Sequence, residues 1–75
     1  MLEKLQQVFR KVFEDNKLLI SEKTTASDIS MWDSLTHLEL IAEIENEFNV
    51  QFSFNEVMLF NNVGDMLTTI ENKLK

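Results

Sequence analysis

The chain has no cysteine and no proline, and Gly64 is its only glycine. Without cysteine it can form no disulfide, no thiolate metal site and no thiol nucleophile. It also contains no low-complexity run and no internal repeat. Its 75 residues are therefore expected to form one domain, residues 1–75, near the lower size limit for a core that folds without covalent or metal support.

Long hydrophobic runs are also absent. The longest uninterrupted apolar stretches, such as 18–20 and 57–60, cover only a few residues, too few to span a membrane. The first residues mix charged and polar side chains with apolar ones, unlike a secretory signal. The apolar fraction of 44% is nevertheless ordinary for a globular chain. We expect a cytoplasmic protein, a monomer, that does not associate with membranes.

Lysine and arginine are missing from most of the chain, since none occurs between Thr24 and Asn72. The same stretch holds nine acids, namely Asp28, Asp33, Glu39, Glu43, Glu45, Glu47, Glu56, Asp65 and Glu71. The formal net charge is -6. Such a segment repels phosphate backbones, which argues against nucleic acid binding. It would attract basic protein surfaces instead, or it could simply be a solvated acidic face.

The hydrophobic pattern predicts four helices. Apolar residues recur at helical spacing over 2–15, and a long loop follows over 17–32. Asp33 is suited to cap a helix that runs to Phe48. Ser53 and Glu56 form a capping box that opens a short helix ending near residue 60, and Asn61 or Asn62 can cap the last helix. We therefore expect an all-α fold, a small four-helix bundle with three longer helices, one short helix and a long loop between helices one and two.

Several apolar residues outside the helix stripes are expected to help fill the core. The loop should be fastened by Leu18, Leu19, Ile20 and Ile29. The segment 48–54 alternates like a strand but has no partner strand, so we expect an extended connection that places its aromatic side chains in the core. The methionines Met31, Met58 and Met66 are interpreted as core fillers.

The second helix has two separate apolar stripes when residues 34–48 are placed on a helical wheel. One is an ordinary core face, made of Leu40, Ile41, Ile44 and Phe48. The other is made of Leu35, Leu38 and Ala42 and is bordered by Glu39, Glu45 and Asn46. A helix of a monomeric bundle needs only one stripe, so the second favours a docking surface for a partner with a basic, apolar-centred face. Alternatively, Leu35 and Leu38 could lie beneath the long loop.

Ser34 opens this helix beside Asp33, between the two stripes. A phosphate esterified to its hydroxyl would lie near the positive end of the helix dipole and near unpaired backbone N–H groups. A serine at a helix start is, however, most often an ordinary capping or surface residue.

Asp33-Ser34-Leu35, opening an acidic helix that ends in Glu45-x-x-Phe48, resembles the acyl carrier protein family, and the resemblance extends over the whole chain. It implies that Ser34 carries a phosphopantetheine arm, by which acyl thioesters are presented to partner enzymes of fatty acid, polyketide or related biosynthesis. It also implies partner docking, by a phosphopantetheinyl transferase and by acyl-transferring or ligating enzymes with basic surfaces, at Asp33, Leu35, Leu38, Glu39, Ala42 and Glu45. The positions that match the acyl-accommodating interior of the family are Leu40, Ile41, Ile44, Phe48, Phe52, Val57, Phe60 and Leu67.

Some positions depart from the pattern of fatty-acid carriers. Many of those carriers have glycine two residues before the aspartate, whereas this chain has Met31 followed by Trp32. Thr36 replaces a common acid, and Asn46 interrupts the run of glutamates. The resemblance is therefore closer to discrete carriers of specialised pathways, and the cargo could be a fatty acyl, polyketide or aminoacyl group.

Three other functions fit the sequence less well. Asp33, Ser34 and His37 lie close in sequence, but a hydrolase needs a base, an orienting group and oxyanion donors around a shaped pocket, so we expect no enzyme activity. His37 is instead predicted to lie half-buried at the core edge. One histidine, no cysteine and carboxylates strung along a helix provide no recognised metal-ligand spacing. The strongest alternative is an unmodified acidic interaction module that docks a basic partner without a prosthetic group.

Overall fold

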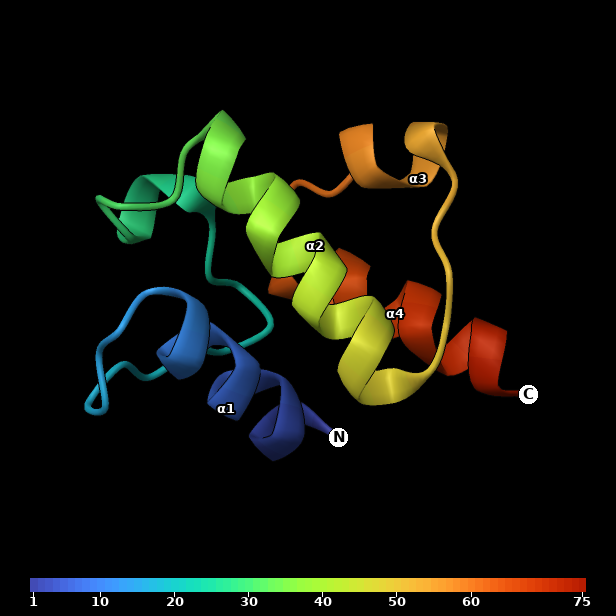
Figure 1. Cartoon of the computed structure of the whole chain (residues 1–75), viewed down its shortest axis with the longest axis horizontal. Helices are drawn as coiled ribbons and strands as arrows, with labels where there is room; N and C mark the ends of the chain where they lie inside the picture. The colour runs from blue at the N-terminus through green and yellow to red at the C-terminus, as the bar shows by residue number, and fades with distance from the viewer.

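The computed structural model describes all 75 residues and contains helices and no strands. The elements are α1 (Leu2–Val12), the 3₁₀ turn η1 (Ala26–Asp28), α2 (Ser34–Phe48), α3 (Phe54–Met58) and α4 (Val63–Leu74). In Figure 1, α2 runs diagonally through the middle of the molecule, with α1 on one side and α4 on the other. In the same view, the short α3 lies to the right of the upper half of α2. The predicted bundle of three longer helices and one short helix is confirmed.

The core is built entirely from apolar side chains. All 17 buried residues are hydrophobic, and 15 of them form one continuous cluster. The seven largest fully buried side chains come from α1, α2 and α4, namely Leu5, Phe9, Leu40, Ile44, Val63, Met66 and Ile70. The predicted core face of α2 is confirmed, since Leu40, Ile41, Ile44 and Phe48 are all buried.

The first helix ends at Val12, earlier than the predicted residue 15. Phe13 donates its backbone N–H to Phe9, but Glu14 then adopts a left-handed conformation with φ 52°, which stops the helix. The chain turns back over α1, where the Arg10 Nε–H donates to the Leu18 carbonyl at 2.8 Å. The Ile20 N–H donates to the side-chain oxygen of Gln6 at 2.9 Å. The long loop is therefore secured by polar contacts as well as by apolar ones.

The loop is also joined to the first turn of α4. The Val63 N–H donates to the Thr24 carbonyl at 2.9 Å, and the Gly64 N–H donates to the Glu22 carbonyl at 2.8 Å. A Cβ atom at position 64 would lie 3.0 Å from that same Glu22 oxygen. The only glycine of the chain therefore lies where the loop backbone approaches a helix so closely that a side chain would require the loop to shift by a few tenths of an ångström.

Some predicted core contacts are wrong. Leu19 is 75% exposed, so only its neighbours Leu18 and Ile20, together with Ile29, contribute to the core. Met31 and Met58 are also exposed, which leaves Met66 as the only core filler of the three. These side chains belong to turns and short segments, where no helical repeat indicates which face points inward.

The connection between α2 and α3 is extended, as predicted, but it buries fewer aromatic rings than expected. Val50 is buried, Phe52 is half-buried, and Phe54 is exposed because it opens α3 on the solvent side. Phe52 packs edge-on against Phe60 with ring centroids 5.4 Å apart. The short helix ends at Met58, two residues before the predicted end, and Phe60 belongs to the turn that follows.

Candidate functional site

The start of α2 is held by a reciprocal cap between Asp33 and Thr36. The Asp33 carboxylate accepts the backbone N–H groups of Leu35 and Thr36 at 3.0 and 2.9 Å. The Thr36 hydroxyl accepts the Asp33 N–H at 2.7 Å, and its oxygen also lies 2.7 Å from the Met31 carbonyl. The backbone N–H of Thr36 is the main reason that the pKa of Asp33 lies below its ordinary value, with smaller contributions from the Thr36 hydroxyl and the Leu35 N–H. Asp33 as the N-cap is confirmed.

Ser34 is the first residue of the helix after this cap, and its side chain is exposed. The cap fixes the backbone on both sides of the serine, so its hydroxyl projects from a defined position. A phosphoester at this hydroxyl would lie at the positive end of a 15-residue helix. The position can therefore present a phosphate-linked group to solvent and to a visiting protein.

The second apolar stripe of α2 faces solvent. Leu35 is 68% exposed and Leu38 is 61% exposed, so neither lies beneath the long loop. Ala42 and Glu39 are exposed as well. The stripe thus extends along the open face of α2 from the turn that holds Ser34.

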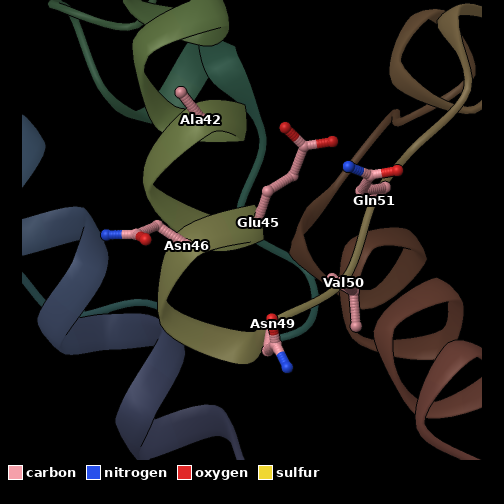
Figure 2. Close-up of a pocket in the computed structure, with 6 residues that line it drawn as sticks. All are labelled: Ala42, Glu45, Asn46, Asn49, Val50 and Gln51. Carbon is pink, nitrogen blue, oxygen red and sulfur yellow. The ribbon is translucent and has the colours of Figure 1, made fainter.

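Glu45, like Asp33, is a predicted docking residue that also serves the fold. Its carboxylate accepts the Phe52 N–H at 2.8 Å and so holds the connection to α3 against the end of α2. Figure 2 shows this carboxylate directed toward the connection, beside Gln51. A hollow of about 610 Å³ is lined here by Ala42, Glu45, Asn46, Asn49, Val50 and Gln51. It lies at the opposite end of α2 from Ser34 and is mostly polar, so we assign it no part in the candidate site.

A second pocket, of about 590 Å³, adjoins Ser34. It lies between the first half of α2 and α3, and seven of its eleven lining residues are hydrophobic. Of the residues predicted to accommodate an acyl chain, only Val57 and Phe60 line it. Leu40, Ile41, Ile44, Phe48 and Leu67 are buried in the bundle, and Phe52 packs against Phe60.

Trp32 and His37 form one side of this pocket. The indole N–H of Trp32 donates to Nδ1 of His37 at 2.9 Å, and the two rings are stacked with centroids 5.9 Å apart. The other ring nitrogen, Nε2, lies 3.2 Å from the Val57 carbonyl of α3. His37 is half-buried, as predicted. Both of its nitrogens have partners other than Ser34, so this structure does not place it as a base for the serine.

Sequence reasoning missed these two hydrogen bonds of His37. They join residues from the loop, α2 and α3, and no local pattern indicates which carbonyl an isolated histidine will meet. The only available hint was that the single tryptophan and the single histidine of the chain flank Ser34.

Known proteins similar to this chain point to one family. The family profile described as "Phosphopantetheine attachment site" matches residues 3–70. An acyl carrier protein from Streptococcus thermophilus is 31% identical over 75 residues, which cover 100% of this chain and 97% of that protein. The solution NMR structure of a holo acyl carrier protein from Geobacter metallireducens superimposes with a TM-score of 0.91 and 37% identity, covering 97% of this chain and 84% of that one.

Proposed function

We propose that Ser34 carries the phosphopantetheine arm of this chain, since the chain belongs to the acyl carrier protein family, whose members carry that group. The observation that carries the assignment is the exposed serine at the capped start of α2. The terminal thiol of the arm would form the thioester with the acyl group, which explains how a chain without cysteine handles acyl cargo. The protein itself presents the arm and performs no bond-making step.

The exposed stripe beside Ser34 is the proposed docking surface for partner enzymes. Leu35 and Leu38 would enter an apolar patch on the partner, while Glu39 and Asp33 would meet basic residues at its border. The partners would be a phosphopantetheinyl transferase and enzymes that load, extend or remove the acyl group. Because Glu45 is held by the Phe52 N–H, we expect it to contribute charge to this surface more than a movable contact.

Intact-mass measurement after incubation with a phosphopantetheinyl transferase and coenzyme A tests the assignment. The wild-type chain should gain one phosphopantetheine, and Ser34→Ala should gain none. Ser53→Ala is the matched control, because Ser53 is also a serine at the start of a helix, although it is a cap with its side chain bonded to Glu56. A phosphopantetheine on Ser34→Ala would show that the attachment site is another residue.

The alternative function is an unmodified acidic interaction module, and the exposed stripe would serve that function equally well. The same experiment separates the two, because the module predicts no mass gain for the wild-type chain with any transferase tested. An aminoacyl cargo, the other alternative, predicts the same mass gain but loading by an amino-acid-activating enzyme.

A further inference from the structure

The two hydrogen bonds of His37 determine its protonation state in this structure. An indole N–H can only donate, so Nδ1, which receives it, must carry a free lone pair. A carbonyl can only accept, so Nε2, which faces the Val57 oxygen, must carry the hydrogen. The ring is therefore neutral, with its hydrogen on Nε2. We call this chain of contacts, from Trp32 through His37 to the Val57 carbonyl, the His37 bridge.

The His37 bridge joins three segments at the pocket beside Ser34. Trp32 ends the loop and is only 8% exposed. Its ring packs edge-on against the ring of Phe9, with centroids 5.2 Å apart, and also packs against the ring of Phe13. The indole is thus fixed by the core. Val57 is buried in α3. The imidazole, half-buried at the pocket, is the part of the bridge that can move toward solvent.

A proton on Nδ1 is incompatible with this arrangement, since two N–H groups would then face each other across 2.9 Å. Histidine is the side chain that commonly changes charge between about pH 5 and pH 8. Three of the acids on the segments that border the pocket have bonds of their own. Asp33 lines the same pocket but is bonded to the start of α2, Glu56 of α3 is paired with Lys73, and Asp28 of η1 is bonded to Thr25. No lysine or arginine lines the pocket, so no local cation opposes the imidazolium.

We propose that His37 is a positioning residue. Its protonation breaks the hydrogen bond to Trp32, moves the imidazole away from the side of the pocket that it lines, and so opens the pocket beside Ser34. In the neutral form the bridge joins α3 to the loop along one side of the pocket. In the protonated form the imidazole no longer covers the side of the pocket that Trp32 and Val57 line. The consequence for cargo rests on the proposed arm at Ser34: an apolar acyl chain would enter the pocket more readily at mildly acidic pH.

The first experiment uses the apo protein and so does not depend on the arm. Because Trp32 is the only tryptophan, the chain has a single indole N–H resonance in a proton–nitrogen NMR spectrum. This resonance should shift upfield as the pH falls from 8 to 5, in step with the carbon-bound ring protons of His37. An indole resonance that stays constant while those ring protons titrate would overturn the proposal.

Two substitutions of His37 separate its two bonds. His37→Asn places an amide oxygen near the position of Nδ1, so it should keep the indole N–H bonded and independent of pH. His37→Gln places an amide nitrogen near the position of Nε2, so it should leave the indole in the upfield, unbonded state at every pH. If the indole resonance of both variants changed with pH as it does in the wild type, the group whose protonation shifts that resonance would not be His37.

The second experiment measures the effect on cargo with the octanoyl-pantetheine form. For the wild-type chain, the rise in melting temperature caused by octanoylation should be larger at pH 5.5 than at pH 8, and for His37→Asn it should be equal at the two values. If octanoylation raised the melting temperature of the wild-type chain equally at the two pH values, the proposed effect on cargo would be overturned. If no arm attaches at Ser34, the proposed function fails, whereas the NMR titration of the apo protein still decides whether the bridge opens.

Discussion

Gly64 is the residue at which a normally stabilising substitution should destabilise. Alanine in place of glycine inside a helix ordinarily stabilises by about 1 kcal/mol. Here the new Cβ would lie 3.0 Å from the Glu22 carbonyl and 3.2 Å from Oδ1 of the capping residue Asn62. The loop would have to move away from α4, so we expect Gly64→Ala to lower the free energy of unfolding by about 1 kcal/mol.

Urea denaturation measures this effect, and Thr68 provides the control. Thr68 is an exposed residue of α4, so Thr68→Gly should be less stable than Thr68→Ala by the ordinary helix preference. A Gly64→Ala protein more stable than the wild type would mean that the loop can shift away from the added Cβ without lowering the free energy of unfolding.

Asp33 makes the start of α2 sensitive to acid. Its pKa in the folded protein lies below the ordinary value of 3.8, because its ionised carboxylate accepts the Thr36 and Leu35 N–H groups. A group whose pKa is lowered by folding stabilises the protein above its unfolded pKa, and this contribution is lost as the pH falls through the folded pKa. The stability that Asp33 provides should therefore be constant above about pH 5 and decline below pH 3.8.

The comparison with Asp33→Asn isolates this contribution, since asparagine also caps helices but does not titrate. The difference in urea midpoint between the two proteins should be largest near pH 6 and shrink toward pH 3. The pKa of Glu56 is lowered too, mainly by the Ser53 N–H and then by Lys73, but that group is present in both proteins and cancels. A difference that stays constant down to pH 3 would contradict the assignment.

At the scale of single residues, the sequence predicted contacts that are local. Asp33, Ser53 and Asn62 cap the helices that follow them, as their side chains and spacing indicate. The sequence did not predict the partners of His37 or the close approach at Gly64. Val57 and Glu22 are distant along the chain, and the orientation of Trp32 relative to α2 depends on the path of the loop before the helix. The exposure of Met31 and Met58 was also missed, since a turn and a five-residue helix are too short for an apolar repeat to identify their inner face.

Helix α2 serves both the core and the exposed surface, and its charged border should control how quickly partners arrive. Glu39 is exposed beside Leu35 and Leu38, whereas Glu47 is exposed farther along the helix, outside the stripe. Charge reversal at Glu39 should slow encounter with a basic partner, and the effect should be largest at low ionic strength, where screening is weakest. We expect Glu39→Lys to reduce the rate of arm loading by about tenfold at low salt.

Glu47→Lys is the matched control, because it changes the net charge of the same helix by the same amount. The loading rate by a phosphopantetheinyl transferase should fall less for Glu47→Lys than for Glu39→Lys, and both should approach the wild-type rate in high salt. Equal losses for the two variants would mean that net charge alone governs encounter, without a role for the stripe.

It could be predicted that the longer elements are helices, because their apolar residues repeat with the period of a helix. The core face of α2 follows from that repeat, since all four of its predicted residues are buried. The ends of α1 and α3 were placed too late. Glu14 stops α1 in a left-handed conformation, and Phe60, just after α3, packs on Phe52. Neither feature is visible in the local pattern.

The molecule as a whole carries a surplus of negative charge with few compensating pairs. The structure contains two salt bridges between side chains, Lys11–Glu43 and Lys73–Glu56. Repulsion among the remaining acids lowers the stability of the compact state, and added salt screens it. We therefore expect the melting temperature to rise by about 5 °C between low ionic strength and 0.5 M sodium chloride.

Differential scanning calorimetry of the apo protein checks this expectation, and Glu47→Gln provides a matched comparison. The variant removes one exposed acid that takes part in no ion pair, so it should melt higher than the wild type at low salt and respond less to added salt. A melting temperature that does not change with salt would show that repulsion among the acids is unimportant for stability.

The hydrogen bonds from Val63 and Gly64 to the loop also bear on the order in which the chain folds. Their acceptors, Thr24 and Glu22, precede α2, whereas the donors follow α3, so these bonds close a loop that contains both helices. Contacts across such long stretches form only after much of the intervening chain is ordered, because their closure entropy must first be offset. The amide hydrogens of Val63 and Gly64 should consequently become protected from exchange late in refolding. In the native protein, their exchange with solvent should report the detachment of the loop that leads to Ser34.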